Sequence, residues 1–267
     1  MLAPLALFTL LQASISGADG LTLANARLTH GVLGANRENA DVRPGDSLIL
    51  SFDIQGISID AAGKASYATT VKVTDASGKA IFEQQPKKIQ EFLPLGGATA
   101  PAFAQIDLGP DSPAGKYSMT VTVTDTGNGK TANYKQDFSV LPKAFDLVRL
   151  TVTGDADGLV PLGAQAVGQP YWVHASVVGY ERPATGTKQP NVTIKLQVYE
   201  GLKPIMAMPF TGVVDKDVPM NAQSLPVRFF LPLNKAGNYT VELTATDELK
   251  KGPPARVTYP LKVVSIP

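Results

Sequence analysis

The chain has 267 residues, enough for one large domain or two domains of ordinary size, and 44% of them are hydrophobic while 18% are charged. These fractions are typical of a folded globular protein and exclude an intrinsically disordered one. The 24 Lys and Arg residues nearly balance the 23 Asp and Glu residues, so the net charge of +1 gives no reason to expect a nucleic acid or an anionic membrane as a partner.

The start of the chain predicts a secretory signal peptide at residues 1–18. Leu2 to Leu11 form an apolar run, and small residues such as Ser16 and Ala18 follow it. No Lys or Arg precedes the run, which departs from the usual pattern, and a buried N-terminal helix is the alternative. The run is too short to span a membrane. We therefore expect a secreted or periplasmic protein without a membrane span.

The chain contains no cysteine. Small extracellular domains of animal proteins commonly depend on disulfides, so an exported chain without them favours a bacterial cell envelope. The same absence excludes thiol catalysis and metal sites built from cysteine.

An internal repeat divides the chain into two copies, offset by 122 to 123 residues. The stretch AGKYSMTVTVTD at 114–125 recurs as AGNYTVELTATD at 236–247. Two copies are too few for a solenoid, so the repeat predicts homologous domains at 20–142 and 143–267. Their linker, around 141–145, has no Gly/Ser tract and predicts a restricted mutual orientation. Further matches at this offset are 27–29 with 149–151, and Ile106 and Leu108 with Phe229 and Leu231.

Apolar and polar residues alternate within each copy. Tyr117, Met119, Val121 and Val123 share one face of a predicted strand, and Ser and Thr residues occupy the other. Clusters of Gly, Pro and Asp separate such segments, and no long helical stripe occurs after the N-terminal run. The pattern predicts an all-β chain of two tandem Ig-like antiparallel β-sandwich domains, with about seven strands in each copy.

The tyrosine at the start of this strand carries a resemblance to a known family. Tyr117 follows Leu-Gly-Pro at 108–110, and Tyr239 follows Leu-Pro-Leu at 231–233. These runs resemble the tyrosine-corner region of fibronectin III-like and other bacterial immunoglobulin-like domains, although the second copy displaces the proline by one position. The resemblance implies a sandwich whose tyrosine hydroxyl caps the backbone at a crossover, and it implies no particular activity.

Motifs for catalysis or metal binding are scarce. His30 and His174 are the only histidines, and no recognised nucleophile, nucleotide or zinc motif stands in a suitable context. The sequence therefore predicts a protein that is not an enzyme and has no cofactor, with an unrecognised catalytic site as the alternative. Asp155 to Gly158 resemble the start of a calcium loop, but Leu159 to Pro161 do not continue it, which favours an ordinary Asp/Gly turn and no metal site.

Trp172, the only tryptophan, and His174 are the candidate partner-contact residues. The repeat aligns Trp172 with Ile49 and His174 with Ser51, on the strand face opposite Leu50. This register predicts that both side chains point away from the core, toward a partner, a sugar ring or the other domain. A slip of one residue would instead make Trp172 a core residue, and the sequence leaves both possibilities open.

These observations predict an exported, non-enzymatic binding or structural protein of the bacterial cell envelope, acting through two rigidly joined domains on a protein or a polysaccharide. The alternative is an accessory or chaperone-like module that serves an envelope enzyme or assembly system by strand addition or carbohydrate contact.

Overall fold

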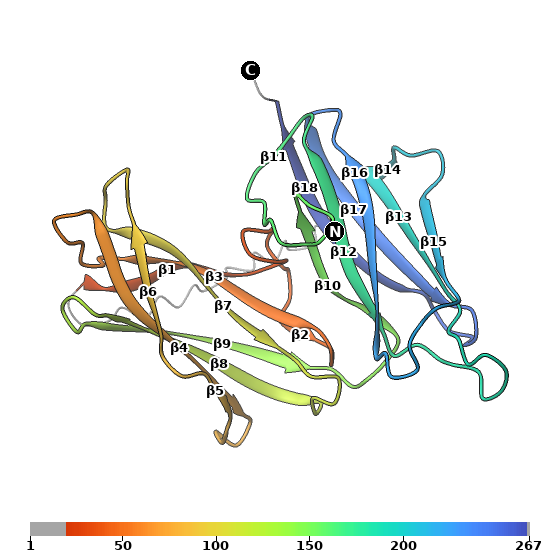
Figure 1. Cartoon of the computed structure of the whole chain (residues 1–267), viewed down its shortest axis with the longest axis horizontal. Coiled ribbons are helices and arrows are strands. Elements are labelled where there is room, and N and C mark those ends of the chain that lie inside the picture. Colours follow the sequence, from red (N-terminus) through yellow and green to blue (C-terminus); the bar gives the residue numbers. More distant parts are fainter. Residues whose placement is uncertain (1–19, 266–267) are drawn as a thin grey trace, which may run out of the picture.

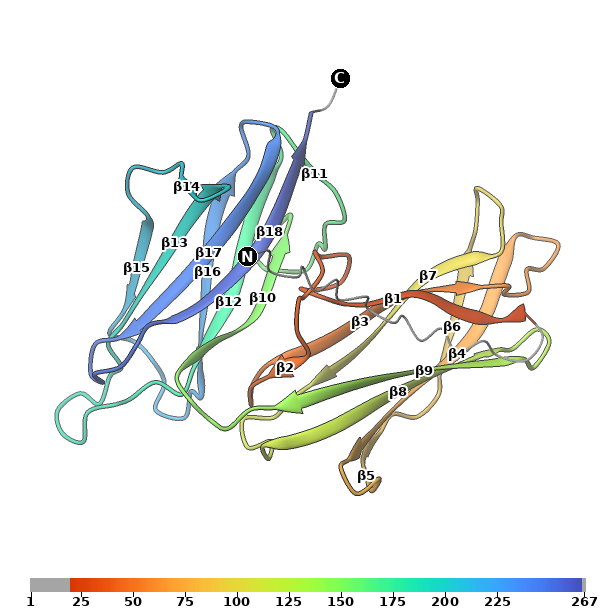
Figure 2. The same ribbon diagram turned by 180° about the vertical axis from the view of Figure 1, so that it is seen from behind.

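The computed structural model describes residues 20–265, so the predicted signal peptide at 1–18 lies outside the described residues. This part of the chain forms strands and loops without an α-helix, and it holds no helix that could cross a membrane. Its strands form four sheets, arranged as two sandwiches that are steeply inclined to each other (Figures 1 and 2). The predicted all-β fold of two tandem sandwiches is confirmed.

The first sandwich comprises nine strands. The sheet orders are β1-β3-β7 and β2-β9-β8-β4-β5, and β6 also pairs with β4. The strands are β1 (Thr22–Thr29), β2 (Asp41–Val42), β3 (Ser47–Gln55), β4 (Lys64–Asp75), β5 (Ala80–Glu83), β6 (Lys87–Phe92), β7 (Thr99–Asp107), β8 (Gly115–Asp125) and β9 (Thr131–Val140).

The second sandwich repeats this topology strand for strand. Its sheet orders are β10-β12-β16 and β11-β18-β17-β13-β14, and β15 also pairs with β13. The strands are β10 (Asp146–Thr153), β11 (Gln165–Ala166), β12 (Pro170–Val178), β13 (Val192–Glu200), β14 (Lys203–Pro204), β15 (Phe210–Val214), β16 (Ser224–Pro232), β17 (Gly237–Asp247) and β18 (Ala255–Val264).

Each sandwich has its own core between its two sheets. Leu50 on β3 and Met119 and Val121 on β8 are fully buried in the first core. Val173 on β12 and Val241 and Leu243 on β17 take the corresponding places in the second. The inward residues of the repeated stretch thus form a core in both copies, as their alternation predicts.

The strand pairing around a β-bulge in β1 and β10 shows that one predicted match between the copies is wrong. The pairing of β1 with β3 shifts between Ala24 and Arg27, and the pairing of β10 with β12 shifts between Val148 and Thr151. The residues after Ala24 and Val148 have positive φ angles of 52° and 55°, respectively, so Arg149 is the counterpart of residue 25 rather than of Arg27. Residues 27–29 therefore correspond to 151–153, and the match of 27–29 with 149–151 is wrong by two residues.

A second shift of two residues affects β16. Ile106 pairs with Leu48, and Leu231 pairs with Tyr171, the counterpart of Leu48. Leu231 therefore corresponds to Ile106 rather than to Leu108, and the proposed 231–233 run is not the counterpart of 108–110. The shift leaves every side chain on its predicted face because side chains alternate with a period of two.

The tyrosines of the repeated stretch cap backbone groups, as the resemblance implies. The Tyr117 hydroxyl donates to the Pro113 carbonyl at 2.9 Å, and the Tyr239 hydroxyl lies 3.3 Å from the carbonyl oxygens of Lys235 and Ala236. A side chain at Gly237 would come within 2.8 Å of the Tyr239 hydroxyl. Glycine at this position of the stretch therefore makes room for the tyrosine ring.

The aspartates that end the repeated stretch are buried anchors. The carboxylate of Asp125, which is fully buried, accepts hydrogen bonds from the Ser58 amide and hydroxyl at 2.7 Å and from the Gly127 amide at 2.8 Å. Burial acts to raise the pKa of Asp125, but these hydrogen bonds outweigh it and hold the pKa below its usual value. Asp247 in the second copy accepts from the amides of Glu181 and Leu249 at 2.8 and 3.0 Å. Both residues tie two loops together at one end of a sandwich.

The free edges of β7 and β16 carry prolines at equivalent positions. Within residues 20–265, β7 pairs only with β3 and β16 only with β12, where Pro101 lies opposite Asp53 and Pro226 opposite Ser176. Proline has no N–H to donate, so within a strand it is accommodated where its nitrogen faces away from the paired neighbour. Each proline therefore removes a donor from the free edge, and Pro232 lies at the same edge of β16.

Candidate functional site

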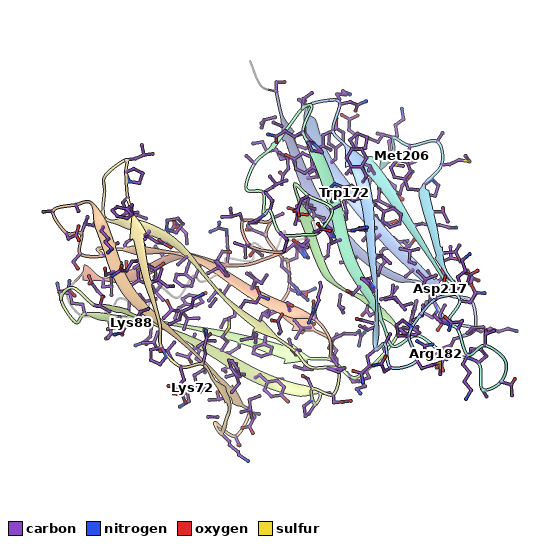
Figure 3. All side chains as sticks on the ribbon, viewed as in Figure 1. Lys72, Lys88, Trp172, Arg182, Met206 and Asp217 are labelled. Carbon is purple, nitrogen blue, oxygen red and sulfur yellow. The ribbon has the colours of Figure 1, made fainter. Side chains whose placement is uncertain are left out.

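Trp172 lies on the outer face of the β10-β12-β16 sheet (Figure 3). Its neighbours in β12, Tyr171 and Val173, are fully buried, whereas Trp172 and His174 are half-buried on the opposite face. This is the orientation that the repeat register predicts. The slipped register, which would make Trp172 a core residue, is excluded.

Trp172 packs against two residues of the edge strand β16. Its ring centroid lies 5.2 Å from that of Phe230, its cross-strand neighbour, and 5.9 Å from the Arg228 guanidinium carbon. His174 lies directly opposite Arg228. Phe230 is 46% exposed, so the group presents an aromatic ring to solvent. We call Trp172, His174, Arg228 and Phe230 the aromatic face.

Two members of the aromatic face, Arg228 and His174, have partners within the chain. Arg228 donates to the Ala156 carbonyl at 2.9 Å and forms an ion pair with Asp157 at 3.8 Å. The His174 Nε2 atom lies 2.8 Å from the Thr153 hydroxyl, and burial lowers the pKa of His174. The exposed part of the face therefore combines the Phe230 ring with the Arg228 side chain, which is 58% exposed.

The loop at 154–160 is an Asp/Gly turn that covers part of this face. The Asp155 carboxylate accepts from the Leu159 amide at 3.0 Å and from the Val160 amide at 2.7 Å. These bonds, led by that of Val160, hold the pKa of Asp155 below its usual value. Gly158 lies against the His174 ring. Within residues 20–265 no three His, Asp or Glu side chains are arranged to hold a metal ion.

A polar interface joins the two domains. Asp46, only 4% exposed, accepts a hydrogen bond from the Arg149 amide at 2.8 Å, and Arg149 Nε donates to the Gly45 carbonyl at 2.7 Å. Arg43 forms an ion pair with Asp146 at the start of β10. Arg149 is the bulge residue with positive φ, so the bulge aims its amide at Asp46.

The loop between β1 and β2 completes the interface. The Ala35 amide donates to the Tyr259 hydroxyl at 3.1 Å, and the rings of His30 and Tyr259 are 5.8 Å apart. A side chain at Gly31, whose φ is +81°, would come within 2.2 Å of the Thr151 hydroxyl. The close approach therefore requires glycine at this position.

The residues that the second domain contributes to this interface differ from their counterparts in the first domain. In the first domain, Gln136 takes the place of Tyr259 and Asn25 that of Arg149. Burial, followed by the nearby Arg37 charge, lowers the pKa of His30 to about 4, so the interface contains a neutral imidazole at pH 7. The joint between the domains thus rests on residues that the repeat does not share, and repeat analysis alone does not reveal them.

No protein-family model and no curated protein matches the chain. It is similar to red sea bream transglutaminase with 12% identity and a TM-score of 0.28, over 91% of this chain and 31% of the transglutaminase, so it spans under a third of that protein. It is also similar to the C-terminal domain of the Streptococcus pyogenes antigen I/II-family protein AspA, with 10% identity and a TM-score of 0.28, over 89% and 98% of the two chains.

The first of these similarities corrects one prediction. The lack of catalytic motifs predicts a protein that is not an enzyme, yet one of the similar structures is an enzyme. That prediction is withdrawn, because a catalytic site can be built from residues that form no motif in the sequence. At these TM-scores neither similarity assigns a reaction or a ligand to this chain.

Proposed function

We propose that the chain is an exported binding protein of the bacterial cell envelope, built from two immunoglobulin-like domains, and that it contacts a protein partner through the aromatic face. The observation that carries the proposal is the half-buried Trp172 packed against the exposed Phe230, with Arg228 beside it. Tryptophan and arginine are enriched among the residues that dominate binding energy at protein interfaces.

The surroundings of this pair favour a protein over a polysaccharide. A sugar presents many hydroxyl groups and needs unpaired polar side chains that converge on it. Here Arg228 is already bonded to Ala156 and Asp157, and His174 to Thr153. Exposed Pro226 and Pro232 flank Arg228 and Phe230 on the same face of β16. A surface that combines exposed aromatic and proline side chains with a paired arginine is suited to another protein surface.

The prolines also weigh against strand addition, the other mode considered from the sequence. An added strand needs a row of free N–H and C=O groups along an edge. Pro226 and Pro232 remove donors from the free edge of β16, and Pro101 does the same on β7. Side-chain contact across the sheet face is the mode that this geometry supports.

The proposal is tested by affinity capture from a bacterial envelope extract. We expect a protein partner that binds the wild-type chain, and binding weaker by roughly 30-fold with Trp172→Ala, the loss typical of a dominant interface residue. The control is Thr120→Ala, which changes an outward residue of β8 in the first domain, far from Trp172 in the sequence, and this variant should bind normally. The fluorescence of Trp172, the only tryptophan, should shift when the partner binds. Binding that survives Trp172→Ala, or that is lost when polysaccharide rather than protein is digested, would refute the proposal.

A further inference from the structure

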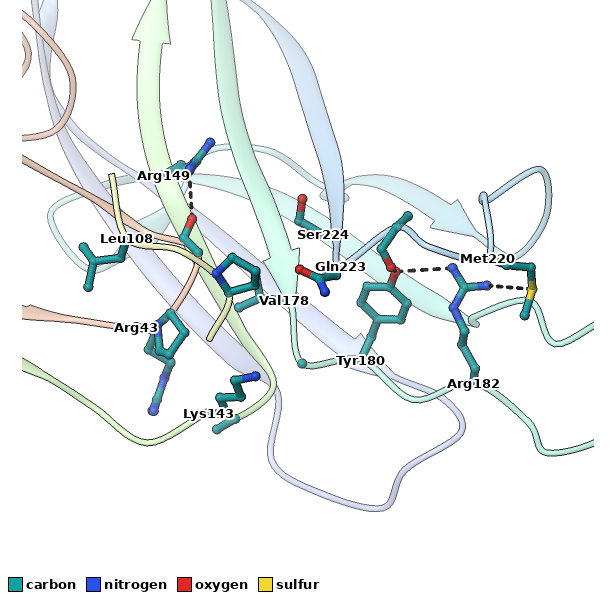
Figure 4. A pocket seen from close by; sticks show the side chains of 16 residues that line it. Arg43, Leu108, Lys143, Arg149, Val178, Tyr180, Arg182, Met220, Gln223 and Ser224 are labelled. Atoms are coloured by element: carbon teal, nitrogen blue, oxygen red, sulfur yellow. Dashed lines mark hydrogen bonds between the residues drawn. The ribbon is translucent and has the colours of Figure 1, made fainter. Parts of the chain in front are cut away.

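A cavity of about 500 Å³ lies where the linker meets both domains (Figure 4). This volume is within the range of pockets that bind small molecules. The first domain contributes Pro44 and Leu108, the linker contributes Lys143, and the second domain contributes Val178 and Tyr180. Since hydrogen bonds between Ala35 and Tyr259 and between Arg149 and Asp46 join the two domains, the cavity is formed before any ligand arrives.

The charged residues that line the cavity are all cationic. They are Arg43, Lys143, Arg149 and Arg182, and the lining includes no carboxylate. In Figure 4 the first three lie on one side of the cavity and Arg182 lies on the other. The first three pair with carboxylates outside the lining, which belong to Asp146, Asp111 and Asp107, respectively. Within the described part of the chain Arg182 forms no ion pair, so its charge is not compensated.

Neutral groups hold the Arg182 guanidinium in place. It donates to the carbonyl oxygens of Lys188 at 2.9 Å and Pro219 at 2.7 Å and to the Tyr180 hydroxyl at 3.4 Å, and its Nη1 atom lies 3.9 Å from the Met220 sulfur (Figure 4). Its central carbon lies 5.5 Å from the centre of the Tyr180 ring. A guanidinium fixed by carbonyl groups keeps its full positive charge, and an anion is the partner that would balance it.

We propose that this cavity binds a small organic anion, a phosphate or carboxylate group carried on an apolar body. The uncompensated positive charge of Arg182 would hold the anionic group. The body would pack against the apolar walls formed by Leu108, Pro110 and Val178. This site is separate from the aromatic face, whose residues do not line the cavity.

The test is calorimetric titration of the purified chain with hexyl phosphate, hexanoate, inorganic phosphate and hexanol. We expect saturable binding of hexyl phosphate or hexanoate, which also separates the two anionic groups. Inorganic phosphate should bind more weakly, since it lacks the apolar body, and hexanol should not bind, since it lacks the charge. Arg182→Gln should weaken binding about tenfold or more, as expected for loss of a charge-assisted hydrogen bond. Lys262→Gln, which removes an exposed positive charge on β18, should leave it unchanged.

A second variant keeps the proposal testable if Arg182→Gln fails to fold. Met220 is 59% exposed, so Met220→Glu should fold normally while it places a carboxylate beside Arg182, and it should abolish binding. Three results would overturn the proposal: no binding of either organic anion up to about 10 mM, binding of hexanol as strong as that of hexyl phosphate, or equal losses in Arg182→Gln and Lys262→Gln.

Discussion

Replacing Asp46 by alanine should weaken the joint between the domains. The Asp46 carboxylate accepts from the Arg149 and Ser47 amides at 2.8 Å and from Arg37 at 2.9 Å. Alanine leaves all three donors without this acceptor, and two of them are part-buried backbone amides. Removing one member of a buried charged network costs about 3 kcal/mol in free energy of unfolding, which corresponds to a fall of roughly 10 °C in melting temperature for a domain of this size.

Differential scanning calorimetry and small-angle X-ray scattering test this prediction together. We expect the wild-type domains to unfold in one coupled transition, and Asp46→Ala to separate the transitions and to increase the radius of gyration at temperatures where both domains are folded. Asp215→Ala, which removes an exposed carboxylate after β15, is the control and should match the wild type. The reasoning is refuted if Asp46→Ala melts in a single transition within about 2 °C of the wild type.

Three further predictions concern the anchors and the interface. Asp125→Ala should lower the free energy of unfolding by about 4 kcal/mol in denaturant titrations. Asp247→Ala should lower it by about 3 kcal/mol, because Asp247 accepts fewer hydrogen bonds. Equal losses in the two variants would contradict this account. The pKa of His30 is about 4 in the folded chain and 6.5 unfolded, so the wild type should lose up to about 3 kcal/mol as the pH falls from 6.5 to 4, and His30→Gln should lose less in melts over this range. Gly31→Ala should increase the radius of gyration, whereas Gly63→Ala, with a similar φ and open space around it, should cost only the backbone strain of about 1 kcal/mol; identical behaviour would show that the Thr151 contact is unimportant.

The sequence predicts most of the fold because the apolar alternation has a fixed period. Met119, Val121 and Val123 are all buried as their positions require, and the same parity correctly places Trp172 on the outer face. The parity also places Asp125 inward, at the end of the repeated stretch. An inward aspartate could have been predicted to be structural from this parity alone, because a buried carboxylate needs hydrogen bonds from neighbouring loops.

The interface between the domains could not be predicted in the same way. Its residues contact each other across more than 100 positions of the chain, as Asp46 and Arg149 do, and no local pattern encodes such a pair. The counterpart of Asp46 is Gln169, so comparison of the copies hides the role of the aspartate. The cavity at the linker has the same origin, because Arg182 becomes a cavity residue only when the two domains are docked.

The edge prolines have a consequence for how a duplicated chain folds. Two similar sandwiches joined by a short linker experience each other at an effective concentration of the order of millimolar, where a strand of one copy can pair with the wrong copy during folding. Free edges are the places at which such pairing begins. Pro101 and Pro226 each interrupt the row of N–H donors on the free edge of their strand, so neither β7 nor β16 offers a continuous edge to a strand of the other copy. We therefore expect the two prolines to disfavour pairing between the copies during folding.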